Sequence, residues 1–151
     1  MRRYRDAILF SALFTGLVLL CGFGAREQGT SSRAFEASVN CHISQLRSKQ
    51  PQQKAAAAYW LGSHGTAAER AIPALIEVLA DQTRINASHY RKAGLDEMAS
   101  LTVGQEAAAA LVNIGRSSTD ALIKTLMTSP APHARENAAW ALGALHRRQM
   151  I

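Results

Sequence analysis

The sequence predicts an all-α fold, a stack of about three helical hairpins that follows an N-terminal hydrophobic leader. Three observations predict it: an apolar run near the N-terminus, a composition rich in alanine, and three segments that superpose on one another. Hydrophobic residues make up 48% of the 151 residues, and aromatic residues only 6%. Because alanine is the best helix former and lets helices approach closely, this composition favours stacked helices over a sheet.

Residues 1–25 are expected to form a signal peptide or membrane anchor. Arg2, Arg3 and Arg5 precede an apolar run over residues 8–20, which is the layout of a secretory signal. Basic residues before such a run keep the N-terminus in the cytoplasm. We therefore expect the rest of the chain to be exported, and to be periplasmic or membrane-anchored in the cell envelope.

The end of the leader is compatible with three forms of attachment. Residues 18–21 resemble a bacterial lipoprotein box, which makes Cys21 a candidate for lipidation, although Leu20 stands where that box has a small residue. Residues 22–24 offer small residues at the spacing that ordinary signal peptidase prefers. Uncleaved, residues 7–25 are about long enough to span a bilayer.

Residues 26–33 are polar, contain glycine and serine, and are expected to be a flexible linker. The repeat domain is expected to occupy residues 34–148. Its cysteine, Cys41, has no partner once Cys21 is set aside in the leader, so a disulfide framework is excluded. We expect Cys41 to be a small buried apolar side chain.

Internal similarity is the strongest evidence for the fold. Leu61, Leu111 and Leu142 superpose, and each follows an alanine pair at the same spacing. Spacings of three, four and seven residues place the small and large apolar residues of each copy on one helix face. In the second and third copies this face consists of Ala107, Ala110, Leu111 and Ile114, and of Ala138, Ala141, Leu142 and Leu145. His64 takes the last place in the first copy, where we expect a partly buried histidine at a helix end.

A second kind of helix alternates with the first. Residues 71–81 superpose on residues 119–126, and a degenerate copy lies at residues 39–48. Proline and glycine separate the elements. The expected helices span residues 34–48, 52–64, 67–81, 103–114, 117–128 and 132–146. The spacing between Leu111 and Leu142 is shorter than that between Leu61 and Leu111, which indicates an insertion at residues 82–102.

Residues 135–145 and 71–81 resemble the short HEAT repeats of the phycobilisome-lyase type, which occur in many bacterial proteins. The resemblance extends over residues 34–148 and implies a HEAT-like α-solenoid. Most proteins with such repeats are scaffolds, and the pigment-attaching lyases are longer. No catalytic motif of that subgroup is present, so the resemblance implies no catalytic residue here.

The insertion is one candidate for partner binding. Its first half is basic, with Arg84, Arg91 and Lys92. Loops that interrupt a regular array often carry specificity, although a solvated loop or a short extra helix without a special role is the simpler interpretation.

Aromatic residues are the second candidate. Tyr59, Trp60 and Trp140 are the aromatic residues of the alanine-rich helices, and Tyr59 and Trp140 are equivalent in the alignment of the copies. An aromatic pair on one side of the array would suit a binding groove, but packing beneath neighbouring helices is the simpler interpretation.

The net charge and the lack of catalytic or metal-binding patterns limit the classes of function that the sequence predicts. The net charge is +6, with acids and bases interspersed, and the basic stripe of a nucleic-acid binder is missing, so nucleic acid is an unlikely partner. The five histidines are scattered and form no metal-binding or catalytic pattern, so we expect no enzyme and no cofactor. The sequence therefore predicts a non-catalytic scaffold that binds another protein in the bacterial cell envelope. An accessory subunit of a cofactor- or pigment-handling enzyme, and a binder of anionic surfaces, are the alternatives.

Overall fold

A computed structural model of the chain describes residues 24–87, 90 and 101–150. The chain divides into two units, residues 1–35 and residues 36–151. The predicted leader, including Cys21, lies almost entirely outside the described residues. Within the described part of the chain, no helix combines the length and the apolar character that a membrane crossing requires.

The first described element is helix α2 (Gly24–Gln45), which contains the boundary between the two units. Residues 26–33, for which the sequence predicts a flexible linker, lie within this helix. The physical reason is the run of strong helix formers at residues 25–28, which a single glycine at position 29 does not interrupt. In the second unit, Val39 of α2 and Leu46 after it are buried, each 1% exposed.

Helix α3 (Pro51–Ser63) is followed by a 3₁₀ helix η1 (Gly65–Ala71) and a short helix α4 (Ile72–Glu77). The single helix predicted over residues 67–81 is thus divided. Pro73 has no amide hydrogen to offer the carbonyl of Glu69, which instead accepts the N–H of Ile72 in the tighter 3₁₀ pattern.

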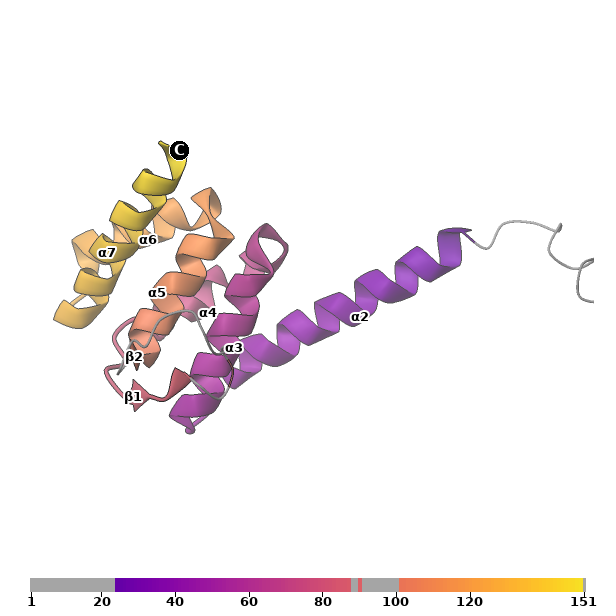
Figure 1. Ribbon diagram of the computed structural model, residues 1–151, viewed down its shortest axis with the longest axis horizontal. Coiled ribbons are helices and arrows are strands. Elements are labelled where there is room, and N and C mark those ends of the chain that lie inside the picture. Colours follow the sequence, from indigo (N-terminus) through magenta and orange to yellow (C-terminus); the bar gives the residue numbers. More distant parts are fainter. Residues whose placement is uncertain (1–23, 88–89, 91–100, 151) are drawn as a thin grey trace, which may run out of the picture. The chain divides into compact units, whose positions relative to one another are not determined.

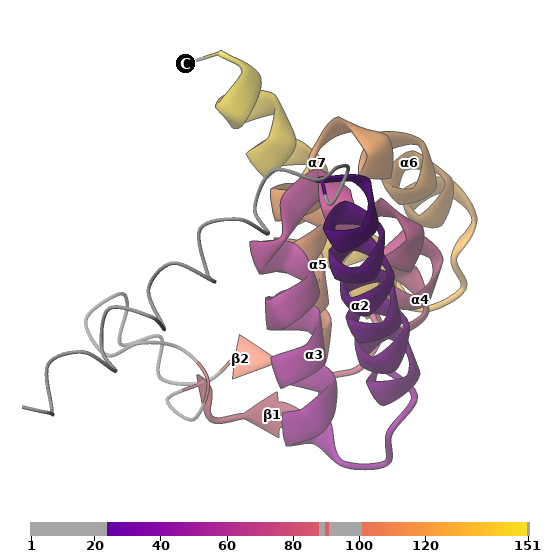
Figure 2. The same ribbon diagram turned by 90° about the vertical axis from the view of Figure 1, so that its right-hand side faces the viewer.

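The ends of the insertion pair as two short strands, β1 (Arg84–Ile85) and β2 (Leu101–Thr102), which were not expected. They are antiparallel, with Arg84 opposite Thr102. They lie beside α3 (Figure 2). Helix α5 (Val103–Ile114) begins directly after β2, where Thr102 and Gln105 form a capping box.

A 3₁₀ helix η3 (Arg116–Ser118), helix α6 (Thr119–Thr128) and helix α7 (Pro132–Gln149) complete the described chain. Gly65 and Gly115, which follow α3 and α5 at equivalent positions, both have positive φ angles, of 54° and 97°. Glycine adopts a positive φ angle without steric strain, whereas residues with a Cβ are strained there, so glycine is favoured at such a helix end. The equivalent residue in α7 is His146, and α7 continues past it.

Within the second unit the helices form two layers (Figure 1). Helices α3, α5 and α7 lie side by side with α5 in the middle, while α4 and α6 contact each other in a second layer. Helices α3 and α5 approach closely, since a Cβ added to Gly62 would lie 2.7 Å from Cα of Ala110. This alternation of two helix types is the predicted all-α, HEAT-like fold.

The buried face predicted for α5 is confirmed, since all four of its residues are at most 2% exposed. In α7, three of the four equivalent residues are buried, whereas Leu142 is only half-buried. The difference arises because α5 has a neighbour on both sides within its layer and α7 has a neighbour on one.

Candidate protein-binding surfaces

A groove lies between α4 and α6, with a volume of about 520 Å³. Its wall is mainly apolar or small, and includes Ile76 and Ala80 from the α4 side and Ala121 from α6. Small side chains on both walls, Ala80 and Ala121, leave room for the groove. Sequence reasoning missed this surface, and the small residues at these two positions were the signal that could have found it.

Two charged residues line the groove, Glu77 and Lys124, and they differ in whether another side chain already forms an ion pair with them. Glu77 lies 3.6 Å from Arg47 in an exposed ion pair. Lys124, on the opposite wall, is exposed, and among the described residues its ammonium forms no such pair. The groove therefore combines an apolar wall with a cation available to a partner.

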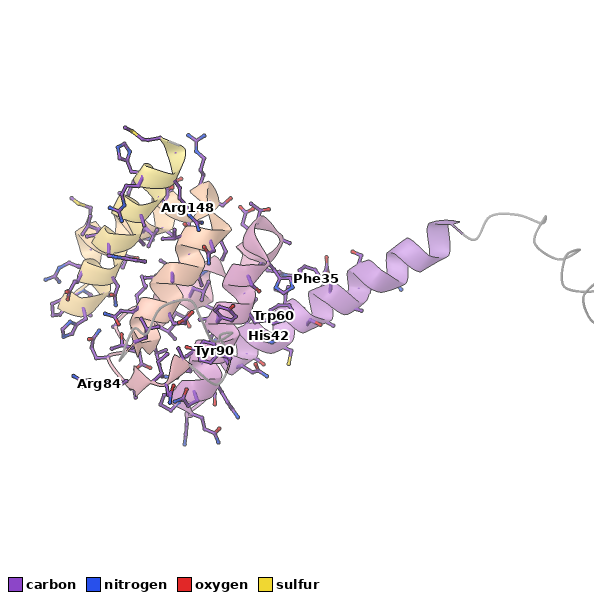
Figure 3. The ribbon with its side chains drawn as sticks, viewed as in Figure 1. Phe35, His42, Trp60, Arg84, Tyr90 and Arg148 are labelled. Carbon is purple, nitrogen blue, oxygen red and sulfur yellow. The ribbon has the colours of Figure 1, made fainter. Side chains whose placement is uncertain are left out.

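Trp60, on α3, stacks between two histidines. The ring of His42 from α2 is parallel to it at a centroid distance of 3.9 Å, and the ring of His64 lies at the same distance on a tilt (Figure 3). The histidine rings are fixed by hydrogen bonds from Nδ1, His42 to the carbonyl of Ser38 and His64 to the carbonyl of Trp60. Trp60 thus joins α2 to α3.

Tyr59, the residue before Trp60, faces the insertion. Its ring lies 5.4 Å from that of Tyr90, and the hydroxyl of Tyr90 donates to the carboxylate of Glu106 at 3.3 Å. Glu106 is buried at the start of α5. The two tyrosines therefore connect the insertion to α3 and α5, while Tyr59 remains 37% exposed.

The basic residues predicted for binding are only partly described. Arg84 is exposed on β1 and lies apart from Trp60 and His42 (Figure 3). Arg91 and Lys92 lie outside the described residues. The structure therefore does not bring Arg84 together with the aromatic candidates.

Trp140 is 52% exposed on α7. Helix α5 lies between α3 and α7, so Trp140 does not join Tyr59 and Trp60 in one surface (Figure 1).

The junction after α4 is held by Asp81. Its carboxylate accepts a hydrogen bond from Nζ of Lys54 at 2.7 Å, and it also accepts the amide of Thr83. Burial by itself raises the pKa of Asp81, but these hydrogen bonds and the charge of Lys54 outweigh it, so the pKa lies below its ordinary value. The carbonyl of Asp81 accepts the amide of Gly104, which fixes the start of α5 against the end of the α4 segment.

Two smaller expectations fail. Cys41 is exposed on α2 rather than buried, because it lies on the side of that helix away from Val39. His64 does sit at a helix end, but it is exposed, since its ring lies on Trp60 at the surface instead of entering the core. As regards metals, no three His, Cys, Asp or Glu side chains gather closely enough to hold an ion in the part of the chain that the structure describes.

Comparison with known proteins agrees with this architecture. The sequence profile of the family described as PBS lyase HEAT-like repeat matches residues 53–81. These residues form most of α3, together with η1 and α4, which is one complete pair of the two helix types. No curated protein and no solved structure gives a significant match.

Proposed function

We propose that this chain is a non-catalytic scaffold that binds another protein through the groove between α4 and α6. The groove itself is the observation that carries the proposal, because a concave, mainly apolar surface with one available cation suits a short apolar segment that carries a carboxylate. The net charge of +6 also favours an acidic partner.

The direct test fills the groove without disturbing the core. Ala80 lines the groove and is exposed, so Ala80→Arg places a large cationic side chain in it. Ala67, an exposed alanine of η1 outside the groove lining, gives the matched control Ala67→Arg. With the tagged full chain, we expect Ala80→Arg to reduce the amount of captured partner about tenfold or more and Ala67→Arg to leave it unchanged.

A photo-crosslinking amino acid at the same two positions identifies what was bound. We expect one covalent adduct from position 80 and none from position 67. Lys124→Glu should weaken capture because it places a like charge near the partner's carboxylate. Equal adducts from both positions, or full capture by Ala80→Arg, would exclude the groove.

The candidates from the sequence, which the structure does not bring together in one surface, are tested separately for the same function. Exchange of Arg84, Arg91 and Lys92 for glutamate tests the basic insertion, and Tyr59→Ala with Trp60→Ala tests the aromatic residues. If these exchanges abolish capture while Ala80→Arg does not, binding occurs at the α3 edge instead of the groove.

We further propose that the chain acts in the cell envelope, attached or exported through residues 1–25. The layout of the leader supports this proposal. Mass spectrometry of the mature N-terminus distinguishes a lipidated Cys21, cleavage near Gly24 and an intact leader. Recovery of the intact chain from the soluble cytoplasm would contradict the proposal.

The match to a lyase-type repeat favours one alternative, a role as an accessory to an enzyme that handles a pigment or cofactor. Visible absorbance that copurifies with the full chain would support it. A colourless chain that captures the same partner with and without added pigment would favour the scaffold.

A further inference from the structure

The outer face of α7 is the equivalent of a face that α3 uses for packing. On α3, Ala58 and Gly62 are buried, and Gly62 lets the backbone of α5 approach. Their equivalents on α7 are Ala139, which is exposed, and Gly143, where an added Cβ would have no neighbour nearer than the side chain of Arg147 at 3.5 Å. A surface built for close helix packing is therefore uncovered.

Four residues form a stripe along this face: Glu136, Trp140, Gly143 and Arg147. Their spacings of four, three and four residues place them on one side of the helix. The buried residues of α7, such as Ala138 and Ala141, lie on the other side. The stripe thus combines an acid, a half-exposed tryptophan, a glycine and a base.

This stripe is complementary to itself. When two α7 helices pack antiparallel about a midpoint between residues 141 and 142, position 136 of one helix faces position 147 of the other, and position 140 faces position 143. Each Glu136 then meets an Arg147. Each Trp140 ring lies over a Gly143, which is free to receive it once the Arg147 side chain beside that glycine turns toward the partner's Glu136. In a parallel pair, Glu136 would face Glu136, so the charges select the antiparallel arrangement.

We propose that two copies of this chain associate through α7 as a symmetric, antiparallel dimer. Such a two-fold contact uses the same surface on both copies, which self-complementarity requires. Helix α6 supports the proposal, because Ile123 and Met127 are 46% and 76% exposed at the same end of the stack. An uncovered repeat usually has a polar outer face, whereas the outer face of this hairpin carries the exposed Ile123, Met127 and Trp140 beside its charges.

The charges provide a test that a misfolded variant cannot imitate. Glu136→Arg alone places two arginines opposite each other, and Arg147→Glu alone places two glutamates opposite each other. Each variant should raise the dimer dissociation constant about tenfold, measured by sedimentation velocity of the full chain in mild detergent. An equimolar mixture of the two variants restores both ion pairs, so we expect heterodimers with an affinity close to that of the unchanged chain.

Control variants separate this contact from other causes. Glu69→Arg and Arg116→Glu reverse exposed charges on η1 and η3 and should leave the dissociation constant unchanged. Trp140→Ala should raise it about a hundredfold, because tryptophan anchors dominate such contacts. A monomeric unchanged chain, or a mixture that associates no better than its components, would overturn the proposal. Ala80→Arg should not affect dimerisation, so failure of the groove and failure of this contact are distinguishable.

Discussion

Helices α3 and α5 on the one hand and helix α7 on the other share the same residue pattern but occupy different environments. Ala58 of α3 and Ala108 of α5 are buried, whereas the equivalent Ala139 of α7 is exposed. Likewise Leu111 is fully buried and Leu142 only half-buried. A repeat therefore carries the same packing surface whether or not a neighbour covers it, and equivalent substitutions in the two regions should differ in cost.

The largest difference in stability is expected between alanine substitutions of the aligned Leu111 and Leu142. Leu111→Ala removes a fully buried side chain and should lower the free energy of unfolding by about 3 kcal/mol. Leu142→Ala removes a half-buried one and should cost about 1 kcal/mol. Urea unfolding of the full chain, followed by circular dichroism, measures both. Equal costs would show that α7 is as well covered as α5.

Substitution of the aligned glycines Gly62 and Gly143 by alanine should change the free energy of unfolding in opposite directions. Gly62→Ala brings a methyl group within 2.7 Å of the Ala110 backbone, so the helices must separate, at a cost of about 2 kcal/mol. Gly143→Ala meets only the flexible side chain of Arg147, at an ordinary contact distance of 3.5 Å. It should stabilise the helix by about 0.5 kcal/mol, since alanine is the better helix former. The same unfolding experiment applies, and a loss at both positions would contradict the comparison.

The chain differs in charge at the ends of α4 and α6, the two helices of the second layer. Asp81 lies in the segment after α4, whereas the equivalent residue at the end of α6 is the neutral Thr128. Because the pKa of Asp81 is lowered by folding, the unfolded chain takes up its proton first as the pH falls. The stabilisation is therefore complete above about pH 4, the ordinary range of the carboxyl, and disappears below it. Asp81→Asn should cost about 1.5 kcal/mol at pH 7.

The pH dependence itself supplies the control for that variant. Between about pH 5 and pH 3 the unchanged chain should lose stability more steeply than Asp81→Asn, and the two should converge in acid. Parallel pH profiles would mean that Asp81 is not the group responsible. Thr128→Ala should leave the profile unchanged.

The smallest expected effect concerns the starts of α5 and α7. Thr102 caps α5 through its side chain, whereas Ala131 at the start of α7 provides no side-chain cap. Thr102→Ala should destabilise the chain by about 1 kcal/mol, and Ala131→Ser should stabilise it by up to about 1 kcal/mol. Thermal unfolding followed by circular dichroism measures both shifts. Shifts in the same direction would exclude capping as the cause.

Much of the architecture was predictable, because it depends on local pattern. The alanine-rich stripes predicted α3, α5 and α7, and the superposition of residues 71–81 on residues 119–126 predicted the alternating helices. The exceptions have local causes that were underestimated: Pro73 divides the third helix, and residues 26–33 contain enough helix formers to continue α2. The paired strands at the ends of the insertion involve residues about sixteen positions apart, which helical periodicity does not detect.

The candidate surfaces were predicted less well. The sequence predicts a binding role for Trp60 and Tyr59, yet their rings pack against His42, His64 and Tyr90 within the chain. The groove between α4 and α6 was not expected at all. Its lining comes from separate helices, and its volume depends on how far those helices stand apart, which side-chain type alone does not specify.

The sequence by itself determined the all-α class, the positions of the helices and the repetition of one packing pattern, because these follow from residue spacing along a single helix. Only the tertiary structure decided which copies of that pattern are covered. Ala58 and Ala139 have the same kind of neighbours in sequence, and they differ in exposure because α5 packs over one and no described element packs over the other. Burial is a property of neighbouring elements, and so are the surfaces that remain available for partners.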